Sequence, residues 1–290
     1  MTAVTRLELD SMPSATTGFL KAAIARRGGL KNGQTIPRIE AVLHDVAISS
    51  AHVRRYAALC GYGDARKVPG TYPHVLAAPM HLKVLTHPNF PLKLPGLVHI
   101  RNDVRQHRPI GLDETVTVLV HVDGHREVHN GLEFDLCTRI EDKAGALVWE
   151  SASTNLLRQR SSGGKKPGSG EPDLSGLAPR ETWQVSASIG RRYGLAAGDV
   201  NPIHMHNAAA KLFGFPRAIA HGMWSFARCI AALDAQRELG GFHADVAFRK
   251  PILLPSSVVF RADDGDAAQS YAVIAEKGDV VHLTGRLERG

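Results

Sequence analysis

The fold and the chemistry of this chain are both indicated by one stretch, Tyr193-Gly-Leu-Ala-Ala-Gly-Asp-Val-Asn-Pro-Ile-His204. It places a carboxyl group, Asp199, shortly before an imidazole, His204. Gly198 allows a tight backbone turn and Pro202 fixes φ at about −65°, so the two side chains are expected to lie close together. A carboxylate beside an imidazole can bind a water molecule and exchange protons with it.

The sequence that leads into this stretch occurs twice in the chain. Residues 46–61 align with residues 183–198 at a separation of 137 positions, and both copies contain Arg-Arg-Tyr. Two later landmarks recur in the same order: Met80 corresponds to Met223, 143 positions on, and Pro109 corresponds to Pro251, 142 positions on. Three matches in register predict two homologous modules.

The division of the chain follows from this duplication. Residues 160–172 lie between the two copies and are rich in Gly, Ser and Pro, which is typical of a flexible linker. A chain of 290 residues can form one large domain or two small ones. We therefore predict an unassigned N-terminal extension (1–40), a degenerate first module (41–158), a linker (159–179) and a catalytic second module (180–290).

Residue periodicity predicts the same kinds of element in both modules. In the second module we expect an extended segment at 182–188, short helices at 191–196 and 207–213, a long helix at 222–239, and strands near 245, 258, 271 and 280. In the first we expect a shorter helix at 80–85 and strands at 114–123, 133–141 and 147–156. A helix followed by antiparallel strands indicates an α+β sheet wrapped around a helix.

Composition excludes several classes of protein. No stretch approaches the roughly 18 apolar residues that a membrane span needs, and the N-terminus has no signal-peptide pattern, so we expect a soluble, cytoplasmic protein. The three cysteines are scattered, which favours buried, reduced thiols. The net charge of +7 could suit a phosphorylated ligand, an acidic partner or nucleic acid. Nucleic acid is disfavoured because the basic residues are dispersed and aromatic residues are few.

Three motifs resemble those of the MaoC-like, R-specific enoyl-CoA hydratases and (3R)-hydroxyacyl dehydratases, in their double-hot-dog branch. The motifs are Gly198-Asp-Val-Asn-Pro-Ile-His204, Ala220-His-Gly-Met223 and Phe248-Arg-Lys-Pro-Ile252. The resemblance covers about residues 40–158 and 180–288. It implies a tandem (double) hot-dog fold of the α+β class, in which an antiparallel sheet wraps a long central helix in each module.

The resemblance also implies an activity, the reversible hydration of trans-2-enoyl thioesters to (3R)-3-hydroxyacyl thioesters in fatty-acid metabolism. The implied substrate is an acyl group on coenzyme A or an acyl-carrier protein, with no further cofactor. We assign the base to Asp199 and the acid and water-orienting role to His204. The family usually has an acidic residue two positions after this histidine, and His206 stands there instead, which predicts a weaker helix cap.

Other residues of the motifs have more than one interpretation. Gly222 stands where the long helix should begin, so its N–H could stabilise an enolate-like thioester oxygen, or the glycine could only provide packing space. Asn201 is interpreted as turn support, with contact to the catalytic pair as the alternative. Arg249 and Lys250 either hold the phosphates of the carrier or form a solvated charge pair. His204-Met-His206 suggests a metal, but without an evident third ligand we predict none.

The first module lacks the reactive groups of the second. Tyr62 occupies the place of Asp199, and Ala78-Pro79 stand where His221-Gly222 stand. We therefore predict one active site per chain, with the first module as its partner in an internal pseudo-dimer and as the acyl-chain tunnel. Pairing of two chains is left open. Two other functions also stay open, a hot-dog thioesterase and a non-catalytic subunit that binds acyl-CoA or acyl-carrier protein.

Overall fold

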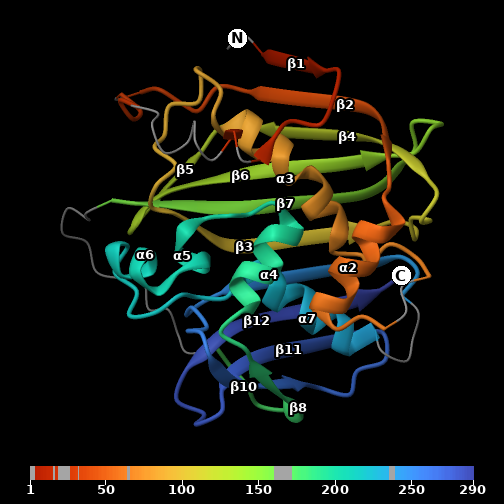
Figure 1. Cartoon of the computed structure of the whole chain (residues 1–290), viewed down its shortest axis with the longest axis vertical. Helices are drawn as coiled ribbons and strands as arrows, with labels where there is room; N and C mark the ends of the chain where they lie inside the picture. The colour runs from red at the N-terminus through yellow and green to blue at the C-terminus, as the bar shows by residue number, and fades with distance from the viewer. Residues whose placement is uncertain are drawn as a thin grey trace.

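The strands form one continuous, largely antiparallel sheet (Figure 1). The computed structural model describes residues 4–15, 17–18, 27–31, 33–63, 66–159, 172–234 and 239–290. Within these residues the strands are β1 (Thr5–Leu9), β2 (Ile39–Ala47), β3 (Leu97–Gln106), β4 (Thr115–Val122), β5 (Arg126–Val128), β6 (Gly131–Glu141), β7 (Leu147–Arg158), β8 (Ala178–Val185), β9 (Phe242–Phe248), β10 (Ser256–Ala262), β11 (Ala268–Ala275) and β12 (Val281–Arg289). Their order in the sheet is β1-β2-β4-β6-β7-β3-β9-β12-β11-β10-β8, and β5 pairs with β6.

The helices lie on one face of this sheet (Figure 1). They are α2 (Ser50–Cys60), α3 (Tyr72–Leu85), α4 (Ile189–Ala197), α5 (Pro202–Met205), α6 (Asn207–Leu212) and α7 (Gly222–Asp234). The order β2-α2-α3-β3-β4-β6-β7 is repeated as β8-α4-α7-β9-β10-β11-β12, with α5 and α6 inserted between α4 and α7. The sequence duplication therefore corresponds to a duplication of structure.

The two repeats meet at the centre of the sheet. Strand β3 pairs with β9 in antiparallel fashion, from Arg101 opposite Ala247 to Gln106 opposite Phe242. Both helices of the Arg-Arg-Tyr copies also meet there, because Tyr56 of α2 and Tyr193 of α4 are buried with ring centroids 6.1 Å apart. Helices α2 and α4 and strands β3 and β9 form this junction. They therefore position the segment that follows α4 against the first module.

The elements expected in the second module are all present, with shifts of a few residues at their ends. The extended segment lies slightly earlier than expected, in β8, and α7 is described as far as Asp234 of the expected 222–239, because residues 235–238 lie outside the described residues. Most of the predicted linker, residues 160–171, also lies outside them. No helix in the described residues is long and apolar enough to cross a membrane.

The first module departs further from expectation. Its helix α3 begins at Tyr72 rather than near Met80 and is 14 residues long, so it is not the short helix expected. Pro73 stands in its first turn, where a missing N–H costs nothing, while Pro79 inside the helix obscured the helical pattern. Strands β1, β2, β3 and β5 were not predicted, and β3 is the most important of them because it joins the two repeats.

Candidate active site

The stretch from Gly198 to His204 forms a compact turn that leads from the end of α4 into α5, and His204 lies in α5. Gly198 ends α4 with φ of 70°, a left-handed conformation that favours glycine. Pro202 is at the start of α5, and the Asn201 side-chain oxygen accepts a hydrogen bond from the Ile203 N–H at 3.3 Å. Asn201 therefore supports the turn. Its own N–H donates to Oδ1 of Asp199 at 3.2 Å, which helps to fix the carboxylate.

His204 lies beside this carboxylate with one nitrogen already engaged. Its Nδ1 donates to the carbonyl oxygen of Ile219 at 2.8 Å, so in the neutral ring Nε2 carries the free lone pair. Burial lowers the pKa of His204, while the charge of Asp199 acts in the opposite direction. The imidazole is therefore neutral at pH 7 and can accept a proton at Nε2. The sequence alone did not indicate this protonation state.

His221 is a third member of the site that sequence reasoning left out of the candidate residues. It is 3% exposed, its ring stacks on that of His204 at 3.7 Å between centroids, and its Nε2 donates to the main-chain oxygen of Asp199 at 3.0 Å. Burial lowers its pKa to about 3. A neutral, buried ring at this place holds both Asp199 and His204 in position. Its occurrence in the His-Gly-Met motif was the available signal.

Two glycines of α4 allow the turn to approach the helix. A Cβ atom at Gly190 would lie 2.2 Å from the carbonyl oxygen of His204, and one at Gly194 would lie 2.7 Å from that of Asp199. At the separation of 137 positions, the first module has Val53 and Ala57 at these places. The internal alignment thus contained a signal for both glycines that the sequence interpretation did not use.

The beginning of α7 adjoins this turn. Gly222 is its first residue, so the N–H at this end of the helix has no intrahelical acceptor and lies at the positive end of the helix dipole. A Cβ atom there would lie 3.0 Å from the ring of Phe248. The glycine therefore provides packing space for this ring, and that role is compatible with an N–H available to a substrate oxygen.

The two basic residues that follow β9 are exposed. Arg249 donates from Nε to Oγ1 of Thr284 at 3.3 Å, and neither Arg249 nor Lys250 forms an ion pair with any described residue. Their main-chain N–H groups both donate to the carbonyl of His282, which fixes this strand end. The main chain is thus fixed at this strand end, while the two side chains that carry the charges are exposed.

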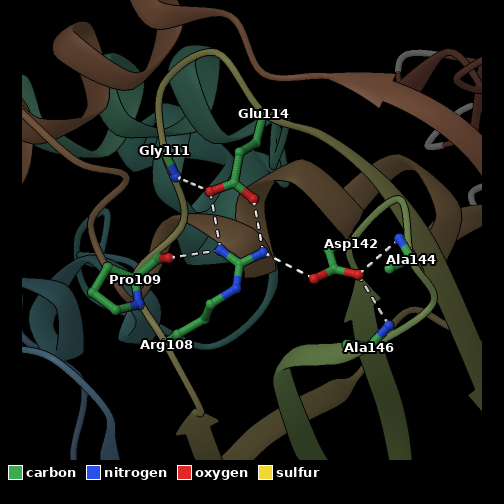
Figure 2. A network of polar contacts seen from close by, with 7 residues as sticks. All are labelled: Arg108, Pro109, Gly111, Glu114, Asp142, Ala144 and Ala146. Carbon is green, nitrogen blue, oxygen red and sulfur yellow. Dashed lines mark hydrogen bonds and ion pairs between the residues drawn. The ribbon is translucent and has the colours of Figure 1, made fainter.

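The corresponding landmark of the first module is engaged in ion pairs, as Figure 2 shows. Arg108 binds both oxygens of Glu114 at 3.0 Å and Oδ2 of Asp142 at 3.1 Å. Glu114 also accepts from the main chain of Gly111, and Asp142 accepts from Ala144 and Ala146. In the first module this position therefore stabilises loops.

His221 supplies the third possible metal ligand that was not evident in the sequence. One ligand atom from each of Asp199, His204 and His221 lies within 4.8 Å of the others. However, the two imidazoles are stacked with an interplanar angle of 26°, so the lone pairs of their free nitrogens lie in nearly parallel planes and do not converge on one ion. This arrangement suits proton transfer better than coordination of a tetrahedral ion.

Comparison with known proteins identifies the family. Residues 177–285 match the family described as MaoC like domain. The chain is 32% identical to 3-hydroxyacyl-thioester dehydratase X of Mycobacterium tuberculosis over 277 residues, which cover 94% of this chain and 98% of that protein. The chain belongs to the MaoC-like 3-hydroxyacyl-thioester dehydratase family. The MaoC-like match falls on the repeat that contains Asp199 and His204.

Solved structures of the family agree in fold. A crystal structure of HtdX from Mycobacterium tuberculosis has a TM-score of 0.76 at 31% identity, covering 87% of this chain and 100% of that chain. A second protein of the same organism, described as having a double hot-dog fold, has a TM-score of 0.57 at 12% identity, covering 90% of this chain and 96% of that one. The α+β double hot-dog fold predicted from the sequence is confirmed.

Proposed function

We propose that this protein catalyses the reversible dehydration of (3R)-3-hydroxyacyl thioesters to trans-2-enoyl thioesters, through Asp199 and His204. The observation that carries the proposal is the pair of proton acceptors on one turn: the Asp199 carboxylate, 44% exposed, and the free Nε2 of the neutral His204. Similarity to a 3-hydroxyacyl-thioester dehydratase over nearly the whole chain supports the reaction class.

In the hydration direction, a water molecule donates one hydrogen bond to Asp199 and the other to Nε2 of His204. As the water oxygen bonds to Cβ of the enoyl group, Asp199 takes one of its protons, and electrons move onto the thioester oxygen. The same proton then passes to Cα, so the C=C bond is replaced by C–O and C–H bonds and the enzyme is restored. Positioned acid–base groups contribute roughly 10²- to 10⁴-fold to such a step.

Because Nδ1 of His204 donates to Ile219, the lone pair lies on Nε2, so the neutral ring orients the water as an acceptor. The sequence analysis assigned the role of acid to His204. That role would require a second proton on the ring, and burial lowers the pKa of this ring. We therefore assign the proton transfer to Asp199 and the orientation of water to His204. His221 fixes both groups through its contacts with the Asp199 backbone and the His204 ring.

The other candidate residues bind the substrate in this proposal. The N–H of Gly222, at the start of α7, donates to the thioester oxygen as it gains charge. Arg249 and Lys250 pair with the phosphates of coenzyme A or a phosphopantetheine arm. The reaction transfers no electrons to or from the protein, so we propose that it needs no cofactor or metal besides the acyl carrier.

The test is hydration of crotonyl-CoA, followed by loss of the enoyl absorbance. Asp199→Asn should lower kcat/KM by at least about 10²-fold, since the amide cannot take the proton. Asp113→Asn, an exposed carboxylate of the first module, is the matched control and should hydrate at the native rate. Undiminished turnover by Asp199→Asn would contradict the assignment. Release of free thiol by the native enzyme would instead indicate a thioesterase, and binding without turnover a non-catalytic subunit.

A further inference from the structure

The inner, helix-facing side of the first module contains a group of buried polar side chains. We define the polar cluster as His74 and His81 of α3, His99 and Asn102 of β3, Thr138 of β6 and Ser151 of β7. Asn102 is 1% exposed, Ser151 is 6% exposed and His81 is 7% exposed. In the register of the sheet, Thr138 is opposite Ser151, so both point to the same face.

A β-bulge places His99 on this face. The register of β3 against β7 shifts between His99 and Arg101, so that His99 is opposite Asn155 while Asn102 is opposite Ser153. Asn155 and Ser153 are two residues apart and share a face, so His99 and Asn102 share it too. In a regular strand, two residues three positions apart would point to opposite faces. The bulge thus turns His99 inward, a use of bulges common next to active sites.

The cluster is continuous from α3 to the strands β3 and β6. The His74 ring contacts His81 at 5.0 Å and stacks on His99 at 6.1 Å between centroids. His81 and Thr138 share a hydrogen bond of 2.7 Å.

At its other end, the cluster reaches the residues around Gly222. Asn102 Nδ2 lies 3.4 Å from the sulfur of Met223, and the His99 ring packs against Phe248 at 5.2 Å. A group bound in the cluster would therefore lie next to the start of α7.

Four polar atoms of the cluster are buried and have no hydrogen-bond partner within the described part of the chain. They are Nδ1 of His74, Nε2 of His99, Oδ1 of Asn102 and Oγ of Ser151. A buried polar atom left without a partner costs about 1–3 kcal/mol, and folded proteins contain few of them. Four in one cluster indicate a site built to bind a polar group.

The cluster is also electrically neutral. Burial lowers the pKa of His81 to about 3 and of His99 to about 4, and it lowers that of His74 well below the usual range. A hydrogen bond from the His99 ring to the main chain of Arg101 acts in the opposite direction on the His99 pKa. Because Nε2 of His99 has no partner, the donor of this bond is Nδ1, and in the neutral ring Nε2 is an acceptor. Because Asn102 Oδ1 is also an acceptor, the matching ligand is an uncharged hydrogen-bond donor.

The second module contrasts with this arrangement. On the inner face of β9 and β12, the corresponding buried side chains are apolar: Ala244, Val246, Leu283 and Leu287. A hydrocarbon chain gains by contact with such a surface and loses where it covers polar atoms that then lack water. The polar face of the first module therefore does not suit the plain acyl tunnel that the sequence suggested.

We propose that the polar cluster binds a hydroxyl group on the acyl chain, so that the preferred substrates are thioesters hydroxylated beyond the reacting carbons. The cluster adjoins Gly222 and Phe248, and two of its free atoms, Nε2 of His99 and Oδ1 of Asn102, accept hydrogen bonds from an uncharged donor. The proposal rests on the dehydratase function proposed above, and it replaces a plain fatty-acyl substrate by a more polar one.

The experiment compares 2-enoyl-CoA substrates of equal chain length, unsubstituted or with one hydroxyl at successive carbons from C5 to C9. One or two adjacent positions should raise kcat/KM by about tenfold over the unsubstituted chain, as one or two good hydrogen bonds would. Crotonyl-CoA is measured alongside as a test of the hydratase function itself. If crotonyl-CoA is not hydrated, the proposed function fails; if it is hydrated but no hydroxyl position is preferred, the polar cluster binds only water and this inference is overturned.

Variants locate the preference in the cluster. Asn102→Leu and Ser151→Ala should reduce the ratio of kcat/KM for hydroxylated over unsubstituted substrate towards one, because each removes an acceptor. Thr117→Ala, which removes a hydroxyl from β4 where it bonds the exposed His44, is the matched control and should keep the native ratio. Because the readout is a ratio within each variant, a general loss of active protein does not alter it. A preference that survives in both cluster variants would contradict the proposal.

Discussion

The helices α2 and α4 end in the same way but are followed by different structures. Both end at a glycine in the left-handed conformation, Gly61 with φ of 78° and Gly198 with φ of 70°. After Gly61 the chain continues with Tyr62, whose hydroxyl bonds to Thr71, whereas after Gly198 it forms the turn of Asp199. The difference shows that the Asp199 turn can pack against α4 because this helix has glycines where α2 has Val53 and Ala57.

The strongest test of this comparison replaces Gly190 by the valine of the first module. The new Cβ would lie 2.2 Å from the His204 carbonyl, so the turn must move away from α4. Since a misplacement of about 1 Å can cost roughly 10²-fold, kcat/KM for crotonyl-CoA should fall by at least that factor. Gly63→Ala, where a Cβ meets no atom of the described residues within 4 Å, should retain native activity. An active Gly190→Val enzyme would show that the close approach is not required.

The next test compares the buried histidines of the two modules through pH. The pKa of His81 in the first module and of His221 in the second is lowered to about 3 by burial. The unfolded chain binds protons on these groups below about pH 6.5 and the native state does not, so stability falls as pH decreases from 6.5 towards 3. Each group contributes about 1.4 kcal/mol per pH unit within that window.

Urea unfolding at intervals from pH 7.5 to 5 measures this slope. His81→Gln keeps a partner for Thr138 but cannot be protonated, so its free energy of unfolding should depend less steeply on pH, by nearly one proton below pH 6. His221→Gln should show a change of the same sign in the second module. Equal slopes in the native protein and both variants would mean that the buried rings are protonated in the native state.

How far the sequence predicted the molecule depends on whether a signal was local. The strands and α7 of the second module, and the Asp199–His204 turn, were predicted because periodicity and a Gly/Pro-rich motif act within a few residues. The start of α3 was missed because Pro79 disrupts the pattern, although the rest of the helix tolerates it. β3 was missed because two of its buried positions are the polar Asn102 and Gln106, which hide the apolar alternation, and because a bulge interrupts its first half. His221 stands in a motif that the sequence did show, but its role was missed because its contacts with Asp199 and His204 are tertiary.

A smaller effect on stability is expected from the corresponding cations of the two modules, Arg108 and Lys250. Arg108→Met removes the ion pairs with Glu114 and Asp142, and because the arginine side chain is 40% exposed the loss should be about 1 kcal/mol of unfolding free energy. Lys250→Met removes an exposed charge without an ion pair among the described residues and should change stability by less than about 0.5 kcal/mol. The difference should shrink in 1 M NaCl, in urea unfolding curves. Equal losses for both variants would contradict the distinction.

The smallest expected effect is on substrate binding, where Lys250→Met should have the larger consequence and Arg108→Met the smaller. If Lys250 pairs with a phosphate of the carrier, Lys250→Met should raise KM for crotonyl-CoA by about two- to fivefold at low salt, the scale of an exposed ion pair, with kcat unchanged. Salt screens such pairs, so the difference in KM should nearly vanish at about 0.5 M NaCl. Arg108→Met, whose guanidinium is already held by two carboxylates, should have the native KM at both salt concentrations. We assign Lys250 to the ligand and Arg108 to the stability of the fold. An increase in KM that is the same for the two variants, or that persists in salt, would contradict this assignment.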